Sequence, residues 1–315
     1  MIKLNQSTFH FFLCLCVILL SCTSNSRQVA MAKDESKVIN VSVLDSLKPQ
    51  ISNKLFSTDS ESLKIITWNI QDLGQSKNED EIKFIVKVLK DFDIIAIQEV
   101  VAKHPAGAQK VAQIADELNR KGSKWDYRIS NPTNSPSAYM SERYAFIWKT
   151  SKVDIKGRAY LDDELESEII REPFIAEFKP KNSDHTFHVV NFHSRKHSDQ
   201  PELEIELFKD YQQRLNTDHI LIAGDFNVNE RHNVWDGFYQ QGYKSAVKNS
   251  KTTLKRKCSR GYYLSHSIDN IYYSKQIKFF NSGVVDYVKV CENLLAARKI
   301  SDHIPVFLEF TIEDN

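Results

Sequence analysis

The sequence predicts an α/β (α+β) domain built from mixed β-sheets and helices. From Leu63 onward, short apolar runs of strand length alternate with segments in which apolar residues recur every three or four positions. Five of the apolar runs lie next to a polar residue that can bind a metal or exchange a proton. In α/β folds such residues collect at strand ends, where ligands bind. No repeat or linker-like segment interrupts residues 63–315, so we expect one domain there.

The first half of this domain is expected to alternate strand and helix. Apolar runs at Ile65–Trp68 and Ile94–Ile97 predict buried strands that lead to Asn69 and Glu99. Apolar residues at helical spacing predict two amphipathic helices. These helices are Asp80–Asp91 and Ala106–Arg120.

The second half is expected to consist mostly of strands, with one helix at Glu202–Leu215. The predicted strands are Tyr144–Trp148, Phe174–Phe178, Thr186–Phe192, Ile220–Gly224, Ile268–Ser274, Ile277–Val284 and Val306–Thr311. Polar residues adjoin three of these strands: His193, the pair Asp225 and Asn227, and the dipeptide Asp302-His303. Two amides, several carboxylates and two imidazoles at strand ends indicate one hydrolytic, metal-dependent site.

The charge balance gives no global attraction to nucleic acid, because 42 Lys and Arg residues face 41 Asp and Glu residues. A local basic stretch lies between Lys244 and Arg260, without any acidic residue, and is followed by Tyr262 and Tyr263. It suits contact with a phosphate backbone, and it equally suits a solvated loop. Its basic residues include Lys248, Lys251, Lys255, Arg256 and Lys257.

The N-terminus is expected to be a targeting segment. Residues 1–21 contain a short apolar core and end just before Cys22, as in a bacterial lipoprotein signal. A lipid on Cys22 would anchor the protein in the membrane of the cell envelope, and residues 22–62 would form a polar tether. The alternative is an ordinary secretory signal, which would leave a secreted or periplasmic protein.

Two cysteines, Cys258 and Cys291, lie within the predicted domain. In an exported protein they can form a disulfide, and they can equally remain two separate thiols.

Six sequence segments carry a resemblance to a known family: TWNIQDLG, IIAIQEV, VVNFH, IAGDFN, SIDNIYY and SDHIPVF. They resemble the endonuclease/exonuclease/phosphatase superfamily across residues 63–311. The stretches 141–146, 160–163 and 171–174 narrow the resemblance to the deoxyribonuclease I branch. The resemblance implies a sandwich of two packed mixed β-sheets flanked by helices, with the active site at one end of the sheets.

The resemblance also implies a role for each candidate residue. Glu99 would be the main Mg²⁺ ligand with Asn69 and Asp302 near it, and Mn²⁺ or Ca²⁺ are alternatives because the ligands are hard oxygen atoms. The remaining implied roles are His193 and His303 as the acid/base pair, Glu142 and Asp269 as their orienting carboxylates, Asp225 and Asn227 for the water and the phosphate, Arg171 for a phosphate oxygen, and Tyr139 in the minor groove of DNA.

Two positions depart from the deoxyribonuclease I pattern. Val101 stands where that branch has an arginine that enters the minor groove, which leaves the binding of double-stranded DNA open. The loop between Asp163 and Arg171 is short, so a structural Ca²⁺ held by Asp163 and Glu172 is less expected than an acidic surface loop.

The leading functional prediction is an exported, monomeric, Mg²⁺-dependent endonuclease that hydrolyses DNA phosphodiester bonds by attack of water. A phosphoesterase for lipid or inositol phosphates is the alternative. A catalytically silent binding protein is disfavoured, because no expected catalytic position is substituted.

Overall fold

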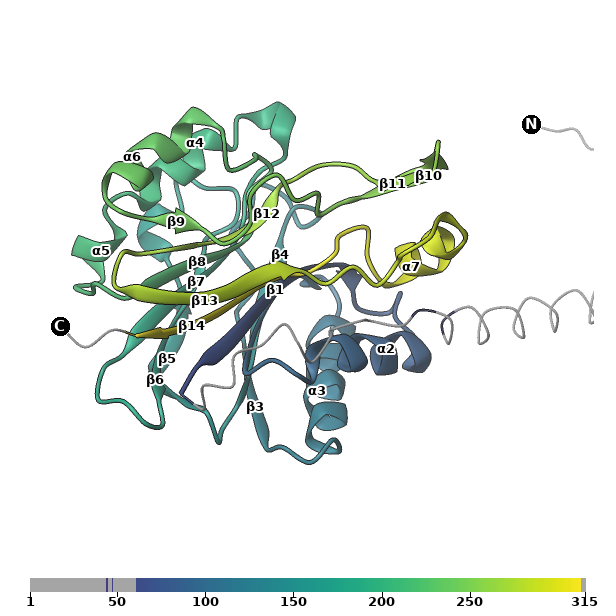
Figure 1. Cartoon of the computed structure of the whole chain (residues 1–315), viewed down its shortest axis with the longest axis horizontal. Coiled ribbons are helices and arrows are strands. Elements are labelled where there is room, and N and C mark those ends of the chain that lie inside the picture. The colour runs from purple at the N-terminus through teal and green to yellow at the C-terminus, as the bar shows by residue number, and fades with distance from the viewer. Residues whose placement is uncertain (1–43, 45–46, 48–60, 313–315) are drawn as a thin grey trace, which may run out of the picture. The chain divides into compact units, whose positions relative to one another are not determined.

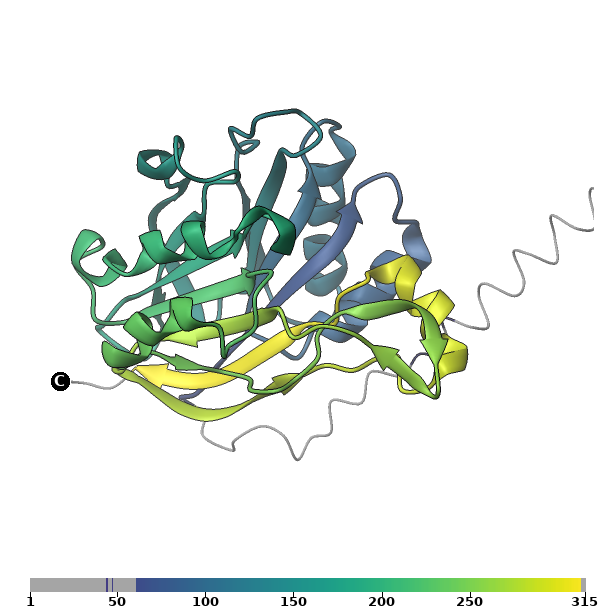
Figure 2. The ribbon, with the colours of Figure 1, turned by 90° about the horizontal axis from the view of Figure 1, so that it is seen from above.

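The computed structural model describes Leu44, Leu47 and residues 61–312, and these residues form two six-stranded sheets packed face to face (Figures 1 and 2). The predicted two-sheet sandwich is therefore confirmed. In the first sheet the strand order is β13-β14-β1-β2-β4-β3, and in the second it is β5-β6-β7-β8-β12-β9. Only β1–β2 and β7–β8 are parallel pairs among the described strands, so both sheets are mixed.

The bounds of the strands are as follows. The first sheet contains β1 Leu63–Leu73, β2 Ile94–Val101, β3 Trp125–Ile129, β4 Glu142–Lys149, β13 Ile277–Val284 and β14 Val306–Ile312. The second contains β5 Val153–Leu161, β6 Phe174–Pro180, β7 Phe187–His193, β8 Ile220–Asp225, β9 Lys244–Ser245 and β12 Asp269–Tyr273. A separate two-stranded hairpin consists of β10 Leu254–Ser259 and β11 Tyr262–Leu264.

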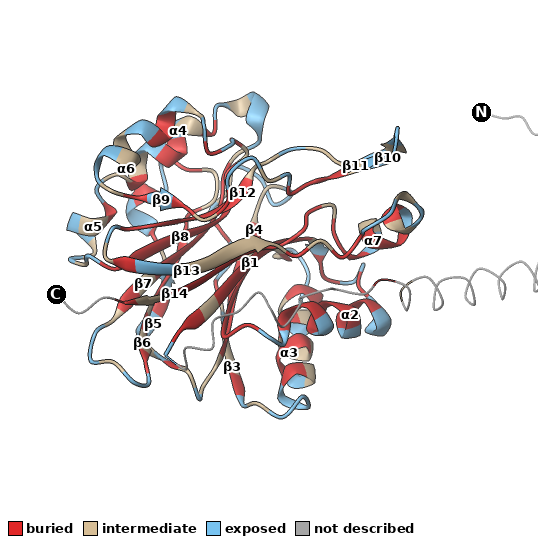
Figure 3. Cartoon of the chain, in the orientation of Figure 1, coloured by how far each residue is buried: buried red, intermediate tan, exposed pale blue. Residues whose placement is uncertain are grey.

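Helices cover the outer faces of both sheets, so the central strands are buried on two sides (Figure 3). One apolar cluster lies between the sheets, a second joins the first sheet to α2, α3 and α7, and a third joins the second sheet to α4, α5 and α6. Burial on both faces explains why the strands read as continuous apolar runs. The helices are α2 Glu79–Leu89, α3 Ala106–Asn119, α4 Glu202–Ile205, α5 Tyr211–Arg214, α6 Asp236–Gln240 and α7 Leu294–Ile300.

A buried polar network joins the two sheets near the site end. Nε2 of Gln98 on β2 donates to Oδ1 of Asn191 on β7 at 2.6 Å and to Oγ1 of Thr67 at 2.9 Å. Nδ2 of Asn191 donates in turn to the carbonyl oxygens of Ile97 and Ala145. Because buried polar groups need partners, these bonds fix how one sheet sits on the other.

The single helix predicted at Glu202–Leu215 is wrong. The structure has α4, a 3₁₀ turn at Glu206–Phe208 and then α5. Tertiary contacts of polar side chains explain the break: buried Glu204 accepts the backbone N–H groups of Ile170 and Arg195, while Tyr211 and Arg214 donate to Asp162. Such contacts override local helical preference.

The basic stretch 244–260 is not a simple loop, because its C-terminal part forms strand β10. Cys258 in β10 is joined to Cys291 by a disulfide, with the Cα atoms 5.7 Å apart. The structure thus selects the disulfide over two separate thiols.

Most of the predicted N-terminal organisation, including residues 1–21 and Cys22, lies outside the described residues. Four residues of the predicted tether are described, Leu44, Leu47, Glu61 and Ser62. Leu47 is fully buried in the cluster beside α2, and Leu44 packs against that cluster. The part of the chain that belongs with the domain therefore begins before residue 63. Among the described residues, no helix has the length and apolar character needed to cross a membrane.

Candidate active site

The candidate residues predicted from strand ends gather at one end of the sandwich. Asn69 and Glu99 lie near the ends of β1 and β2, and the parallel pairing of these strands brings the two residues side by side. In the second sheet, parallel β7 and β8 align His193 with Asp225, and antiparallel β12 aligns Asp269 with Asp225. Sheet pairing alone thus places five of these side chains in two neighbouring groups.

Gly224 makes the close approach of β7 and β8 possible. Its φ angle is +149°, and a Cβ atom built there would lie 1.8 Å from the carbonyl oxygen of Phe192. Only glycine fits such a position. Gly224 therefore sets the position of the neighbouring Asp225.

His193 and Glu142 form the first imidazole–carboxylate pair. Nδ1 of His193 lies 2.9 Å from Oε2 of Glu142, and the other carboxylate oxygen accepts the backbone N–H of Glu99 at 3.2 Å. Burial alone would raise the pKa of Glu142, but His193 and the Arg171 guanidinium hold it below its usual value. Burial and Arg171 act to lower the pKa of His193, and Glu142 outweighs them, so the net shift is upward.

His303 and Asp269 form the second pair. Nδ1 of His303 lies 2.9 and 3.0 Å from the two oxygens of Asp269. Although burial disfavours the imidazolium, Asp269 and Asp225 raise the pKa of His303 to about 10. Burial raises the pKa of Asp269 to about 6, with His303 opposing the rise. At neutral pH the pair is therefore an imidazolium beside a carboxylate.

Asp225 lies between the two imidazoles. Its Oδ2 atom is 3.5 Å from Nε2 of His193 and 3.7 Å from Nε2 of His303. The same oxygen accepts a hydrogen bond from Nδ2 of Asn69 at 3.2 Å, and Oδ1 accepts the backbone N–H of Asn227 at 3.0 Å. The Asp225 carboxylate thus faces Nε2 of both imidazole rings. Nδ1 of each ring is hydrogen-bonded to another carboxylate, that of Glu142 for His193 and that of Asp269 for His303.

Two candidate residues at this end of the sheets have a strained backbone. Glu99 and Asn227 have φ angles of +60° and +54°, which are unusual for residues with a Cβ atom. Glu99 sits at a bulge where the pairing of β2 with β4 shifts register. The bulge re-aims its side chain, since Oε1 accepts Nδ2 of Asn69 at 3.0 Å and Oε2 accepts the backbone N–H of Asp72.

The predicted metal ligands fit a hard divalent cation. Glu99 is half-buried, so its carboxylate remains accessible. Oδ1 of buried Asn69 has no hydrogen-bond partner within the described part of the chain. An orphaned buried acceptor beside a carboxylate is the environment that a Mg²⁺ ion would complete. Asp302 is half-buried and pairs weakly with Arg298 at 3.8 Å.

A second group could also hold a cation on distance alone, since ligand atoms of Asp225, Asp269 and His303 lie within 4.8 Å of one another. Their mutual geometry argues for a different use. The 2.9 Å separation of His303 from Asp269 is a hydrogen bond, so the Nδ1 proton occupies the space between them. A cation beside Glu99 and Asn69 would leave this hydrogen bond intact.

Two predicted phosphate contacts have other partners in the structure. Arg171 is mostly buried; its Nε donates to the carbonyl oxygen of His193 at 3.0 Å, and one Nη donates to that of Ser194. Nδ2 of Asn227 donates to the Ser194 carbonyl at 3.4 Å. Arg171 thus holds the backbone that carries His193, and its phosphate contact stays a prediction.

Tyr139 and Val101 lie at the rim. The Tyr139 ring is 88% exposed, and Nζ of Lys103 lies 4.9 Å from its centroid. Lys103 therefore places a cation near Val101, two residues further along the chain.

Asp163 and Glu172, the two residues considered for a structural Ca²⁺, do not both lie on an exposed acidic loop. Glu172 is buried and accepts the backbone N–H of Asn134, while Asp163 is exposed.

Sequence reasoning missed the residues that hold the candidate side chains in position. Oγ of Ser301 accepts the His303 N–H and donates to the Asn69 carbonyl, which ties the two halves of the site together. Trp68 and Tyr287 both donate to the His303 carbonyl. Burial lowers the pKa of Lys77, although Glu81, Asp72 and Glu99 oppose the shift. The burial of a single Lys or Ser cannot be predicted from the sequence, because it leaves no periodic pattern of apolar residues.

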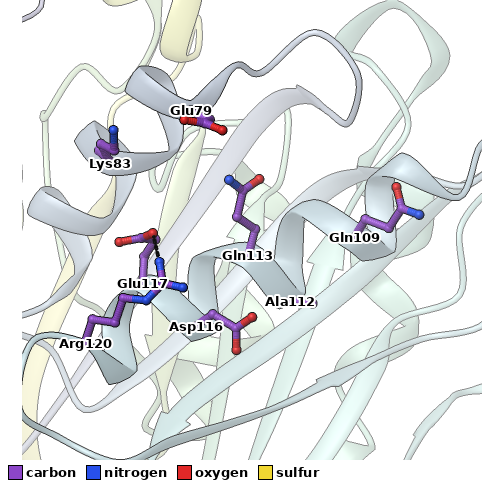
Figure 4. Close-up of a pocket in the computed structure, with 8 residues that line it drawn as sticks. All are labelled: Glu79, Lys83, Gln109, Ala112, Gln113, Asp116, Glu117 and Arg120. Atoms are coloured by element: carbon purple, nitrogen blue, oxygen red, sulfur yellow. Dashed lines mark hydrogen bonds and ion pairs between the residues drawn. The ribbon is translucent and has the colours of Figure 1, made fainter.

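A pocket of about 480 Å³ lies elsewhere, between α2 and α3 (Figure 4). Its lining side chains are mostly polar and belong to the two helices, and Glu117 pairs with Arg120 across one wall. None of the candidate residues contributes to it.

A sandwich of two mixed sheets that gathers carboxylates, amides and paired imidazoles at one end is the arrangement of a hydrolase. The model of the Endonuclease/Exonuclease/phosphatase family matches residues 66–303, and the chain belongs to that family.

Several known relatives of this chain are named deoxyribonucleases. A deoxyribonuclease of Thioalkalivibrio sp. (strain K90mix) is 26% identical over 270 residues, covering 79% of this chain and 71% of that protein. Deoxyribonuclease-1 of Ovis aries is 30% identical over 176 residues, covering 53% of this chain and 66% of that protein. The chain thus spans slightly less than two thirds of the sheep enzyme.

Solved structures share the fold at low identity. A family protein of Bacteroides thetaiotaomicron has a TM-score of 0.59 at 16% identity, covering 80% of this chain and 98% of that one. A mannosyl-6-phosphatase of the same species has a TM-score of 0.59 at 17% identity, covering 79% and 100%.

Proposed function

We propose that the protein is a divalent-metal-dependent endonuclease that hydrolyses DNA phosphodiester bonds. The observation that carries the proposal is Asp225, whose carboxylate faces Nε2 of both His193 and His303 while each ring is backed by its own acid. Hydrolysis of an anionic diester needs a base for the water, an acid for the leaving alkoxide and donors for the phosphoryl oxygens. This set supplies all of them.

The roles follow from the charges around each group. His303 faces the carboxylates of Asp269, Asp225 and Asp302 and is therefore an imidazolium, a donor rather than a base. Asp225 lies between the two rings, and its carboxylate is the acceptor for the water proton. His193 lies on the other side of Asp225 and is a second donor, held by Glu142.

Glu99 and Asn69 would hold the cation, with Asp302 nearby, and Mg²⁺ is the ion that carboxylate and amide oxygens favour. When bound, such an ion neutralises charge on the phosphoryl oxygens and the leaving oxygen. Mn²⁺ and Ca²⁺ are the alternatives for the same ligands. Asn227 and Arg171 are proposed as further donors to the phosphate, and for that role they would exchange the backbone carbonyls of His193 and Ser194 to which they now donate.

DNA is favoured as the substrate by two observations. The relatives that match over long stretches are named deoxyribonucleases. Tyr139 presents an almost fully exposed ring at the rim, with Lys103 beside it, which suits contact with a sugar–phosphate backbone. We further propose that a signal in residues 1–21 exports the protein, that lipid on Cys22 anchors it in the cell envelope, and that it acts as a monomer.

A substrate panel tests the reaction and the substrate together. Purified protein is incubated in the presence of Mg²⁺, in separate reactions, with supercoiled plasmid, single-stranded RNA, a phosphoinositide and mannose 6-phosphate. We expect plasmid nicking that EDTA abolishes. Release of phosphate from the lipid or the sugar, without nicking, would replace the nuclease by a phosphoesterase for lipid or sugar phosphates, a reaction that also occurs on this fold.

A further inference from the structure

The β10–β11 hairpin is joined directly to the catalytic dipeptide Asp302-His303. Thr253, just before β10, pairs with His303 as an antiparallel bridge. The backbone N–H of Leu254 donates to the carbonyl of Asp302 at 2.7 Å, and that of Ile304 donates to the carbonyl of Thr252 at 2.7 Å. A movement of the hairpin base would therefore move His303.

The same segment reaches the second catalytic acid. Oγ1 of Thr252 accepts the backbone N–H of Asp269 at 3.1 Å and that of Ile268 at 3.2 Å. The base of the hairpin thus touches both members of the His303–Asp269 pair, and the hairpin projects from there beyond the sandwich, beside α7 (Figures 1 and 2).

The hairpin carries a concentrated positive charge. No Asp or Glu occurs between Asp236 and Asp269. Four cations lie on the hairpin, with no ion-pair partner within the described residues, and the Tyr262 ring is 67% exposed. These cations are Lys255, Arg256, Lys257 and Arg260. Unpaired charge on a projecting element is costly in self-repulsion unless an anion binds it.

Three covalent and polar contacts hold the hairpin against the body of the protein. Cys258 is joined to Cys291, which begins the 3₁₀ turn Cys291–Asn293 that leads into α7. Nη1 of Arg298 in α7 donates to the carbonyl of Leu254 at 3.1 Å, and the Tyr263 hydroxyl donates to Asp286. The hairpin is therefore a fixed element rather than a free loop.

We infer that the β10–β11 hairpin is a nucleic-acid-binding arm of the active site, fixed in place by the Cys258–Cys291 disulfide. The six residues of β10 span roughly 20 Å, about the length of six base-pair steps. A polymer whose scissile phosphate lies at His303 would continue along this arm, whereas a lipid headgroup or a single phosphate would not reach it. Tyr262 would contact sugars or bases beside the phosphates.

The inference rests on a nucleic acid being the substrate, and its test separates the two claims. The arm variant carries Lys255→Gln, Arg256→Gln, Lys257→Gln and Arg260→Gln. The matched control removes four exposed lysines at the opposite end of the first sheet, near the C-terminal ends of α2 and α3: Lys87→Gln, Lys90→Gln, Lys121→Gln and Lys124→Gln. A third variant, Cys258→Ser with Cys291→Ser, releases the arm without changing its charge.

Binding of a fluorescent 30-base-pair duplex is measured in EDTA over a range of salt concentrations. We expect the arm variant to bind at least tenfold more weakly at 0.15 M salt, and its slope of log K against log salt to fall by about 3 to 4, as for four lost phosphate contacts. The control should stay within twofold of wild type. The cysteine variant should bind three- to tenfold more weakly.

Catalysis gives the second readout. Plasmid nicking in Mg²⁺ should fall in the arm variant as binding does, while hydrolysis of bis(4-nitrophenyl) phosphate stays within twofold, because that small diester does not reach the arm. An arm variant that binds and nicks DNA like the control would overturn the inference while leaving the nuclease intact. Duplex binding through the arm without any cleavage would instead remove the proposed function and keep the arm.

Anionic lipid is the competing partner. Vesicles of phosphatidylglycerol and phosphatidylcholine are therefore offered to the same variants. If the arm variant loses vesicle binding and keeps duplex binding, the hairpin is a membrane contact and the inference is overturned.

Discussion

Nδ1 of His303 lies 2.9 Å from one oxygen of Asp269 and 3.0 Å from the other, while its Nε2 faces Asp225 at 3.7 Å. The ring is thus held at one nitrogen and presents the other to the space where a phosphate would lie. The backbone of His303 is fixed as well, by Ser301 at its N–H and by Trp68 at its carbonyl. Position and protonation of this ring are both set by the surrounding protein.

Replacement of Asp269 by Asn should remove the charge that holds His303 as a donor while preserving shape. We expect kcat for plasmid nicking to fall about 10²-fold, the size of a general acid contribution, with KM changed less than threefold. Steady-state kinetics beside the control Asp126→Asn, a half-buried carboxylate in β3, measure this. A kcat within threefold of wild type would mean that Asp269 does not support His303.

The His193–Glu142 pair predicts how stability depends on pH. The pKa of His193 is raised above its usual 6.5, so its contribution is complete below about pH 6.5 and is lost as the pH rises through the folded value. The pKa of Glu142 is lowered below 4.5, so its contribution is present above that pH and is lost as the pH falls through the folded value.

Melting temperatures in EDTA, from pH 4 to 9, test this for wild type and His193→Gln. The difference in Tm between them should be largest between about pH 5 and 6.5 and should narrow as the pH rises further. A difference that stays constant up to pH 9 would show that His193 gains nothing from its charge in the folded protein.

Glu99→Gln should weaken cation binding more than it disturbs the fold, because Glu99 is half-buried and lies in a strained backbone position that Gln can also adopt. We expect the rise in Tm caused by Mg²⁺ or Mn²⁺ in wild type to disappear, since a ligand stabilises only the state that binds it. Glu79→Gln, an exposed acid in the first turn of α2, should keep the rise. Equal shifts in both variants would place the ion elsewhere.

Gly224 and Gly122 provide a matched pair of glycine substitutions. Both have positive φ angles, but a Cβ atom at Gly122 meets nothing within 4 Å, whereas at Gly224 it meets the Phe192 carbonyl oxygen at 1.8 Å. We expect Gly122→Ala to cost about 1 kcal/mol from backbone strain alone. Gly224→Ala should cost at least about 3 kcal/mol, because overpacking adds to the strain.

Urea unfolding gives both free energies. Gly224→Ala should also abolish activity in the protein that remains folded, since the strand that carries Asp225 must shift. Equal losses of stability at the two positions would contradict the close approach of β7 and β8.

The apolar runs were enough to predict mixed sheets with helices and the position of most candidate residues at strand ends, and the family resemblance added the packing of two sheets into a sandwich. Strands such as Ile94–Ile97 are buried on both faces, so their apolar runs are unambiguous, and Glu99, His193 and Asp225 follow such runs within two residues. The roles assigned to these residues remain predictions, although the structure brings them together.

Other features depend on tertiary contacts that no local pattern reports. Strand β5 has mostly exposed or half-buried residues, so it lacks the apolar run that marks a buried strand. The helix expected at Glu202–Leu215 is broken because Glu204 and Tyr211 bond to distant segments. The hydrogen bonds from the Arg171 guanidinium to backbone carbonyls, and the bulge that redirects the Glu99 side chain, depend on the packed structure and have no local sequence pattern.

The most direct test of the central claim is the nicking of supercoiled plasmid by wild type and by His303→Ala, each with Mg²⁺ and with EDTA. If His303 and Asp225 act on the diester as proposed, wild type nicks only with Mg²⁺, and His303→Ala nicks at least 10²-fold more slowly with an unchanged Tm. Nicking by His303→Ala at the wild-type rate, or by wild type in EDTA, would contradict the account.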